Sequence, residues 1–434
     1  MYNELVTAHA ACEVTPENGS NKARNMNAQV IPMVAPAAAQ APAVTGTYNT
    51  AATSRGGTNG RLSSQWWSRP DDQRFLSLTD LLAHVQGEAD ASSAQVIDAS
   101  KIKVQASRDN AERLTMILPD DTEAAPTHWS FGQTCSLVGA PAGYLRKLPA
   151  ALAGINLQYG LSTFRQELVK TYTRTDGTAE LRAMTGADYG RIHDHELVRA
   201  IMKFAGNGTG DTHWKVPGML DWGSQRGGVV KYNPFVDITK QTTTLFASDR
   251  DVFCFLVDDT HPIEIGKLPN GDPDLVFRGF YAWNSEVGSK TAGVATMYLR
   301  GVCCNRMLWG VENFQEISIR HTKNAPMRFL EEAAPALETY AQASTMKLVE
   351  GVKAAREALV ARDQDDRETF LGKAGFNAKQ VDRIIQAVCD EEGKQPESVW
   401  DFVQGITAVA RTLPHQDARI ELERKAGKLL DKVA

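Results

Sequence analysis

The stretch DVFCFLVDDTHPIEIGKLPNGDPDLVFRGFYAWNSEVGS, residues 251–289, decides the fold class of this chain of 434 residues. Runs of valine, isoleucine, leucine and aromatic residues are separated there by Asp, Pro, Gly and Asn, a pattern typical of β-strands joined by turns. Asp258, Asp259 and His261 lie between two apolar runs, and we expect residues 258–262 to form a hairpin turn. The stretch therefore predicts an antiparallel sheet.

Segments on either side extend this pattern. Strand-like segments continue from residue 229 to residue 322, and helical periodicity dominates beyond Pro326. Two further hairpins are predicted upstream, in residues 101–118 and 167–186, the second with its turn at Asp176-Gly177. The predicted fold class is therefore α+β: a mixed, mainly antiparallel sheet with flanking helices and a helical C-terminal region.

The N-terminal segment differs in composition from the rest of the chain. Residues 1–64 are rich in Ala, Pro, Thr, Asn and Gly and lack apolar periodicity, so they cannot bury enough surface to offset the entropy lost on ordering. We expect a disordered tail over residues 1–64, an α+β core domain over residues 65–325 and a helical region over residues 326–434. Trp66 and Trp67, at the edge of the core domain, are expected to pack in its interior.

Composition and charge exclude several classes of protein. The net charge is −5, so any contact with nucleic acid has to come from a local patch. The six cysteines contain no CxxC pair, and we predict neither a metal nor a cofactor. No apolar run approaches the roughly 18 residues of a membrane-spanning helix, so we predict a cytoplasmic protein without a membrane partner.

Two features in the first half of the chain allow more than one interpretation. His193 and His195 are candidate metal ligands, but no third ligand joins them at helical spacing. We interpret them as polar residues at the start of a helix that Asp194 caps. Residues 128–160 resemble a helix-turn-helix in outline, although two short helices joined by a Gly-Pro turn are common.

A change in the sign of the local charge singles out residues 279–328. They contain six basic and three acidic residues, an excess of three positive charges within a negatively charged protein. Such a patch suits an anionic partner, and aromatic side chains within it can stack on bases. The alternative is that the basic side chains only solvate the outer face of the strands. The residues predicted to bind nucleic acid are Trp283, Lys290, Arg306, Arg320 and Lys323.

Two motifs in this region are similar to those of a known family. NSEVGS, residues 284–289, and RGVCCN, residues 300–305, resemble the signature of the phage and plasmid-like proteins grouped as a domain of unknown function, number 932 in its series. Other stretches extend the resemblance from about Trp66 to the C-terminus. The matching positions are Asn284, Ser285, Gly288, Ser289, Arg300, Val302, Cys303 and Asn305.

The resemblance implies an association with mobile genetic elements, where neighbouring genes often concern recombination and single-stranded DNA. It supplies no catalytic residue. Within the motifs, we expect Asn284 and Ser285 to hold a turn in which Gly288 adopts an unusual backbone angle. Cys303 is expected to be a small buried side chain, and Arg300 to hold Asn284 or Ser285.

Three classes of function follow from these observations. The first, which we favour, is a non-enzymatic protein that binds nucleic acid and protects or anneals single-stranded DNA. The second is a metal-dependent enzyme acting on nucleic acid. The third is an assembly protein that forms homo-oligomers through its C-terminal helices. An enzyme of the second class would use carboxylates such as Asp249, Asp251, Asp258, Asp259 and Glu264.

Overall fold

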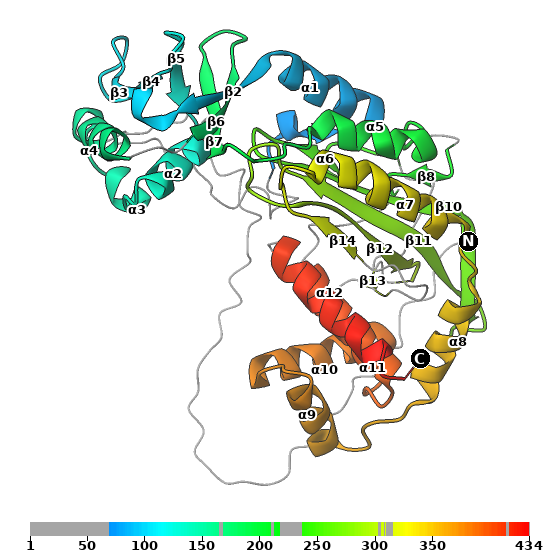
Figure 1. The fold of residues 1–434 in the computed structure, drawn as a ribbon. Helices are drawn as coiled ribbons and strands as arrows, with labels where there is room; N and C mark the ends of the chain where they lie inside the picture. The colour runs from blue at the N-terminus through cyan, green and yellow to red at the C-terminus, as the bar shows by residue number, and fades with distance from the viewer. Residues whose placement is uncertain are drawn as a thin grey trace, which may run out of the picture.

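The structure, a computed structural model, has two β-sheets surrounded by helices (Figure 1). This confirms the predicted α+β class, with its mainly antiparallel sheets and helical C-terminal region. The predicted tail, residues 1–64, lies outside the described part of the chain, as do Trp66, Trp67 and Cys303. The described residues are 69–164, 168–209, 212–217, 237–302, 305–307, 309, 316–413 and 416–433.

The larger sheet, eight-stranded in the described part of the chain, is buried on both faces, which explains the long apolar runs of its central strands. Its strands are β1 (Arg74–Phe75), β8 (Trp214–Lys215), β9 (Leu245–Ala247), β10 (Val252–Lys267), β11 (Pro273–Asn284), β12 (Ala292–Arg300), β13 (Arg306–Met307) and β14 (Glu316–Ile319). The order is β1-β9-β10-β11-β12-β13, with β8 also beside β10 and β14 beside β12. Successive residues of β10 point to opposite faces: Cys254 and Leu256 join one hydrophobic cluster, and Phe253 and Phe255 join another.

The hairpin turn predicted at residues 258–262 is wrong. β10 continues through this segment as one strand, and its pairing with β11 is only interrupted, between Asp258 and Ile263. The chain does not reverse there because β11 pairs with β10 on both sides of the interruption, which is a β-bulge. The reversal comes later, at Gly271, whose φ of 88° suits a tight turn.

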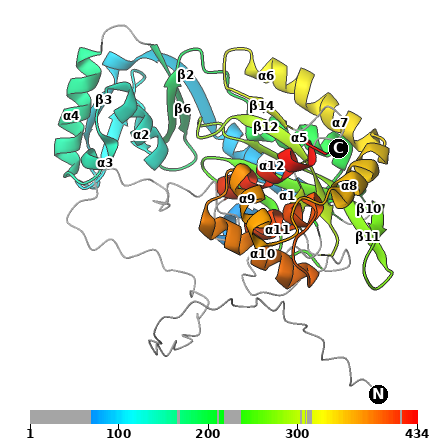
Figure 2. The same cartoon turned by 90° about the horizontal axis from the view of Figure 1, so that it is seen from below.

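Helices cover both faces of the larger sheet. They are α1 (Leu78–Asp90), α5 (Asp194–Ala205), α6 (Ala325–Arg328) and α7 (Ala334–Gln342) on one face and α12 (Gln416–Leu430) on the other. Leu78, Leu197 and Leu337 belong to the same buried cluster as Leu256 of the sheet. On the opposite face, Ile420 of α12 packs on the cluster that contains Phe253 and Phe255. Figure 2 shows the C-terminal helices across the larger sheet and the smaller sheet to one side.

The smaller sheet contains both hairpins that were predicted upstream. Its strands, in the order β2-β6-β7-β5-β4-β3, are β2 (Ser92–Asp98), β3 (Lys103–Ala106), β4 (Leu114–Ile117), β5 (Glu123–Pro126), β6 (Leu168–Arg174) and β7 (Glu180–Gly186). β3 pairs with β4, and β6 pairs with β7, so both predictions are confirmed. The turn between β6 and β7 contains Gly177, whose φ is 110°.

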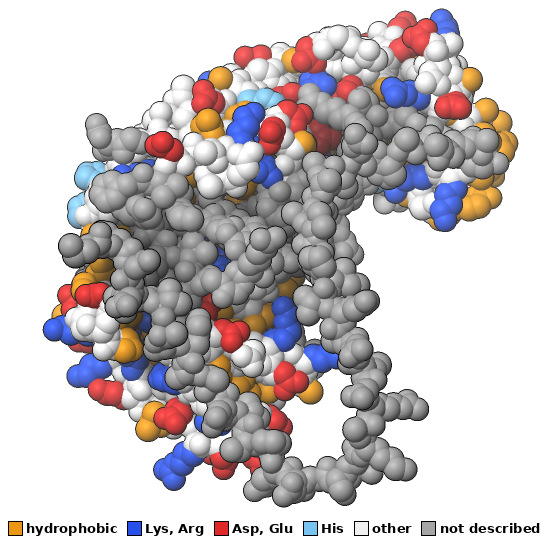
Figure 3. All heavy atoms as spheres, turned by 180° about the vertical axis from the view of Figure 1, so that it is seen from behind, with side chains coloured by type: hydrophobic (Ala, Val, Ile, Leu, Met, Phe, Trp, Pro, Cys, Tyr) orange, Lys and Arg blue, Asp and Glu red, His pale blue; other side chains and the backbone are white. Residues whose placement is uncertain are grey.

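Three helices pack beside the smaller sheet. They are α2 (His128–Leu137), α3 (Ala142–Leu145) and α4 (Ala150–Thr163). Leu157 and Leu161 of α4 belong to the core of this unit, whereas Ile155 and Tyr159 are 65% and 71% exposed. Figure 3 shows hydrophobic side chains gathered at this edge of the molecule. The predicted core domain, residues 65–325, thus contains two sheets with separate hydrophobic clusters.

The helical C-terminal region is centred on α11. Its helices are α8 (Met346–Glu357), α9 (Gln364–Lys373), α10 (Ala378–Glu392), α11 (Val399–Arg411) and α12. The Ser398 side chain accepts a hydrogen bond from Asp401 N–H at the start of α11, and every residue from Val399 to Ala410 is buried. A helix buried all round lies at the centre of its bundle. Among the described residues, no helix combines the length and hydropathy needed to span a membrane.

A buried ion pair attaches α12 to the larger sheet. Arg306 of β13 donates hydrogen bonds of 2.8 and 2.9 Å to Glu423 of α12, and both side chains are 0% exposed. Arg419 also donates to Glu423, at 2.8 Å. Removing one partner of a buried pair leaves an uncompensated charge, which is strongly destabilising. The docking of α12 therefore depends on this carboxylate.

Glu423→Gln is expected to lower the free energy of unfolding by about 3–5 kcal/mol, because Arg306 and Arg419 would lose their countercharge. Urea denaturation followed by circular dichroism measures this change. Glu421→Gln on the same helix is the control, since Glu421 is 71% exposed and its loss should cost less than about 0.5 kcal/mol. Equal stability of the two variants would contradict the interpretation.

Candidate functional site

The NSEVGS motif, residues 284–289, forms a loop at the end of β11 that we call the signature loop. Asn284 begins it, and its side-chain amide donates hydrogen bonds of 2.7 Å to Ile192 O and to Asp194 Oδ1. The prediction that Asp194 caps α5 is therefore wrong. His193 is the N-cap, and Asp194 is the first residue of the helix. Its carboxylate is directed toward the signature loop because Asn284 binds it there.

Two serines and a glycine shape the rest of the signature loop. Ser285 Oγ donates to Arg250 O at 2.6 Å, and Ser289 N–H donates to Ser285 Oγ at 2.9 Å. Gly288 has a φ of 84°, which confirms its predicted unusual backbone angle. A β-carbon at Gly288 would lie 3.3 Å from the ring of Tyr189. Tyr189 in turn donates its hydroxyl hydrogen to Ser285 O at 3.2 Å.

Glu286 extends from the signature loop into a buried cluster of charged side chains. Its carboxylate accepts from Asp194 N–H at 3.0 Å and lies 3.2 Å from Arg182 Nη1 and 3.4 Å from His193 Nδ1. Arg191 Nη1 donates to the backbone oxygen of Glu286. Arg182 belongs to β7 of the smaller sheet, whereas Glu286 follows β11 of the larger one. This ion pair therefore connects the two sheets.

Protonation of the cluster follows from its burial and its charges. Burial raises the pKa of Glu286, but Arg182, His193 and Asp194 N–H together lower it further, to about 2. Asp194 responds in the opposite direction, because burial and the Glu286 carboxylate raise its pKa well above the usual range. Burial and the neighbouring His193 lower the pKa of His195. Glu286 therefore carries the negative charge that the arginines compensate.

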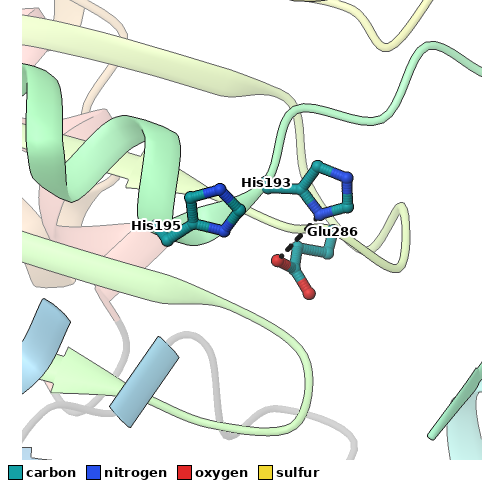
Figure 4. Close-up of side chains that lie close together, drawn as sticks. All are labelled: His193, His195 and Glu286. Carbon is teal, nitrogen blue, oxygen red and sulfur yellow. Dashed lines mark ion pairs between the residues drawn. The ribbon is translucent and has the colours of Figure 1, made fainter. Parts of the chain in front are cut away.

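His193, His195 and Glu286 also lie close enough together to hold a metal ion (Figure 4). Their ligand atoms are all within 4.8 Å of one another. The sequence did not indicate this set because Glu286 comes from a distant segment of the chain. A metal ion would have to compete with Arg182 for the carboxylate of Glu286, and the guanidinium group of Arg191 adds a second positive charge. We therefore interpret the cluster as an ion-pair network that joins the two sheets.

A cavity of about 640 Å³ lies beside the signature loop, and we call it the arginine cavity. Two of its lining residues, Trp129 and Gln133 on α2, donate side-chain hydrogen bonds of 2.9 and 2.8 Å to Val287 O of the loop. None of the described residues that line it is a carboxylate. The lining residues are His128, Trp129, Gly132, Gln133, Ser136, Leu137, Ala142, Arg146, Met184, Thr185, Gly186 and Arg250.

The wall of the arginine cavity is positively charged. Burial lowers the pKa of His128 to about 4, and Arg146 and Arg250 contribute to the same direction. Arg146 donates to His128 O at 3.0 Å, and its guanidinium carbon lies 5.2 Å from the centre of the Phe131 ring. Neutral His128 at pH 7 leaves the arginines as the charged groups of the lining.

A second cavity, of about 410 Å³, begins at Ser289, the last residue of the signature loop, and we call it the aromatic cavity. Phe253, Tyr281 and Trp283 line it, and their rings are stacked in series with centroid distances of 5.7 and 5.3 Å. Lys290 also lines it. The other lining residues are Thr291, Glu316, Ile420 and Arg424, of which Arg424 and Glu316 form an ion pair.

The aromatic cavity brings together two of the residues predicted to bind nucleic acid, Trp283 and Lys290. Arg320 and Lys323 are exposed on the segment after β14. β14 pairs with the start of β12, which places Arg320 near the Lys290 end of that strand. Trp283 itself is only 8% exposed, so it is accessible through the cavity rather than on an open surface.

Arg300 of the second motif and Arg306, which directly follows the motif, are buried. Arg306 is fully buried and pairs with Glu423, which is distant in the sequence. The prediction that Arg306 belongs to an exposed basic patch is therefore wrong. The prediction that Arg300 holds Asn284 or Ser285 is wrong. Arg300 instead donates hydrogen bonds of 2.9 and 2.8 Å to the carboxylate of Asp274 on β11. It supports the fold, as expected, through a different partner.

The remaining matched positions divide between buried and partly exposed. Asn305 is 0% exposed, and its side-chain amide donates to Glu391 at 3.1 Å. Val302 is partly exposed, and Cys303 lies outside the described residues. The sequence interpretation missed Glu286 and Arg250, and it placed Arg146 only on the second helix of the helix-turn-helix outline in residues 128–160. For Glu286, a carboxylate within a loop of small polar residues was the available signal.

Comparison with known proteins identifies the central part of the chain. A family model described as DUF932, a domain of unknown function, matches residues 236–403. Residues 236–403 are thus similar to this family. No curated protein matches the chain, and no solved structure does. The matched segment includes the signature loop, β10 to β12 and the helices up to the first part of α11, and it is narrower than the resemblance expected from Trp66 onward.

Gly288→Ala is expected to destabilise the protein by more than about 1 kcal/mol, because the alanine would need a positive φ and would press on Tyr189. Thermal and urea denaturation measure the loss. Gly139→Ala is the matched control, since Gly139 has a φ of 70° but nothing within 4 Å of an added β-carbon. A cost at Gly288 no larger than at Gly139 would show that the Tyr189 contact is unimportant.

Glu286→Gln is expected to destabilise the protein most at neutral pH. Because the folded-state pKa of Glu286 is lowered to about 2 from an ordinary 4.5, its charge stabilises the fold above pH 4.5, and this contribution is lost as the pH falls toward 2. The stability difference between wild type and variant should therefore shrink over that range. Denaturation curves at several pH values test this, with exposed Glu338→Gln as the control. A difference that does not change with pH would contradict it.

Proposed function

We propose that this protein binds single-stranded nucleic acid without catalysing a reaction on it, at the two cavities beside the signature loop. One observation carries the proposal. Stacked aromatic rings line one cavity beside the signature loop, and basic side chains line both that cavity and the other. The resemblance to phage and plasmid-like proteins supports a role on mobile genetic elements, such as recombination.

Three hydrogen-bonded residues relate the positions of the two cavities. Ser285 Oγ and Ser289 Oγ both donate to Arg250 O, at 2.6 and 3.4 Å. Ser289 lines the aromatic cavity, and Arg250 lines the arginine cavity. A ligand that reached both cavities would meet stacked rings in one and guanidinium groups in the other. A nucleotide chain has the matching chemistry, with bases that stack and phosphates that pair with arginine.

The sizes of the cavities and their charges support a ligand of this kind. Volumes of about 410 and 640 Å³ are within the range of pockets that hold small molecules or nucleotides. Lys290 lines the aromatic cavity, and the exposed Arg320 and Lys323 extend the basic surface beyond it. Glu316 is the carboxylate of this lining, and its ion pair with Arg424 compensates its charge.

The carboxylates considered for a metal-dependent nuclease do not favour that alternative. Asp251 is 1% exposed, and both of its carboxylate oxygens accept from Arg69 Nη2, at 2.9 and 3.0 Å. Asp259 pairs with Lys215 at 3.0 Å. Two-metal catalysis needs several carboxylates that converge on one place.

Homo-oligomer formation through the C-terminal helices stays a prediction.

Lys290→Ala, Arg320→Ala and Lys323→Ala are each expected to lower the salt dependence of binding by roughly 0.7 in slope per lost phosphate contact. Fluorescence anisotropy with a labelled oligothymidine at several salt concentrations measures this. Trp283→Leu is expected to weaken binding by about 1–3 kcal/mol if a base stacks in the aromatic cavity. Lys353→Ala is the control, since Lys353 is 75% exposed on α8.

Two outcomes would contradict the proposal. One is the absence of salt-sensitive binding to single-stranded DNA or RNA. The other is an equal effect of Lys353→Ala and the three basic variants, which would indicate nonspecific attraction. Thermal denaturation of Trp283→Leu separates a loss of stability from a loss of binding, because this side chain is nearly buried.

A further inference from the structure

A second group of histidines with a carboxylate lies at the bulge of β10, away from the signature loop. It consists of His213, immediately before β8, and Asp258 and His261 on β10. Their ligand atoms all lie within 4.8 Å of one another. His261 Nδ1 is 2.8 Å from Asp258 Oδ2, and the rings of His213 and His261 have their centres 5.1 Å apart.

Strand pairing and the bulge bring these side chains together. Trp214 of β8 pairs with Asp258 of the neighbouring strand β10. His213, the residue before Trp214, therefore lies beside Asp258. The interruption between Asp258 and Ile263 lets the chain turn His261 back toward the carboxylate. Bulges often redirect side chains at functional sites. A regular strand would place residues 258 and 261 on opposite faces of the sheet.

Asp258 is held in one orientation. Its Oδ1 accepts hydrogen bonds from Thr260 N–H at 3.1 Å and from His261 N–H at 3.2 Å, which leaves Oδ2 directed toward the imidazole. Asp258 is 7% exposed, whereas His213 and His261 are exposed. The carboxylate is therefore fixed and desolvated, and the two imidazoles are accessible to a solute.

The chemistry of this group suits a transition-metal ion. Two imidazoles and one carboxylate form a common set of three protein ligands, with bonds of about 2.0–2.2 Å and remaining positions for water. The 2.8 Å between His261 Nδ1 and Asp258 Oδ2 is a hydrogen-bond distance, and these atoms would move to roughly 3.3 Å apart around a tetrahedral ion. In the other histidine cluster, Arg182 pairs with the carboxylate that a metal ion would need, Glu286. At the bulge of β10, Lys215 pairs with Asp259 and not with the candidate ligand Asp258.

We propose that His213, Asp258 and His261 bind one divalent transition-metal ion of the zinc class, with water at the open positions. This site is independent of the nucleic-acid interface proposed above. Thr260 Oγ1 lies 3.0 Å from His213 Nδ1 and 2.8 Å from Asp258 Oδ1, so a hydrogen-bonded turn is the competing account of the same geometry. Thr260→Val removes this hydroxyl and keeps the three ligands.

Titration of the metal-depleted, untagged full chain with Zn²⁺ in a calorimeter tests the proposal, and Co²⁺ absorption reports the ligand field. We expect one equivalent of metal per chain, bound at least about tenfold more weakly by His213→Ala, His261→Ala and Asp258→Asn. Thr260→Val should keep the metal. His195→Ala is the matched control for the other histidine cluster and should also keep it.

Thermal denaturation with and without Zn²⁺ gives a second measurement on the same proteins. Zn²⁺ should raise the Tm of wild type and of His195→Ala, and should have little effect on His213→Ala or His261→Ala. Circular dichroism confirms that each variant is folded. The proposal is overturned if wild type binds no stoichiometric metal, if the histidine variants at the bulge bind it as tightly as wild type, or if His195→Ala loses it.

Discussion

The buried carboxylate of Glu286 is the interaction on which the arrangement of the two sheets depends. It is nearly inaccessible to water, and it reaches Arg182 of the smaller sheet and the first backbone N–H of α5 at the same time. A charge removed from water in this way is tolerated only when its partners are in place, so the network admits few alternative arrangements of the two sheets. Asn284 reinforces it by binding the Asp194 carboxylate at the same helix start.

Similar buried pairs connect the other parts of the molecule. Arg300 joins β12 to Asp274 of β11 and, through Glu392, to α10. Arg306 joins β13 to Glu423 of α12. Hydrophobic packing stabilises each layer, but apolar contacts carry little directional information. The buried ion pairs add direction, because guanidinium and carboxylate groups match one another in a fixed geometry. The C-terminal helices are thus held in register on the sheet.

This arrangement leaves the signature loop as a rigid wall between two cavities. Trp129 and Gln133 donate hydrogen bonds to its backbone, and one of its serine side chains donates to the backbone oxygen of Arg250. These hydrogen bonds hold the loop in position. A site built on fixed elements loses less entropy when a ligand binds than a site built on mobile ones. The residues that line the cavities come from both sheets and from α12, so the cavities form only when all three are docked.

The sequence by itself determined the fold class, both upstream hairpins and the positive φ of Gly288. Each depends on neighbouring residues: strand periodicity, a turn sequence such as Asp176-Gly177, or the absence of a β-carbon. Tertiary structure decided the partners. The sequence predicted Arg306 in a basic patch, but in the structure Glu423 neutralises it. The sequence also predicted a turn at residues 258–262, but β11 pairs with β10 on both sides of this segment. Charge compensation and strand pairing act between segments far apart in the chain. A local sequence pattern therefore does not indicate which distant residue will contact a given side chain or strand.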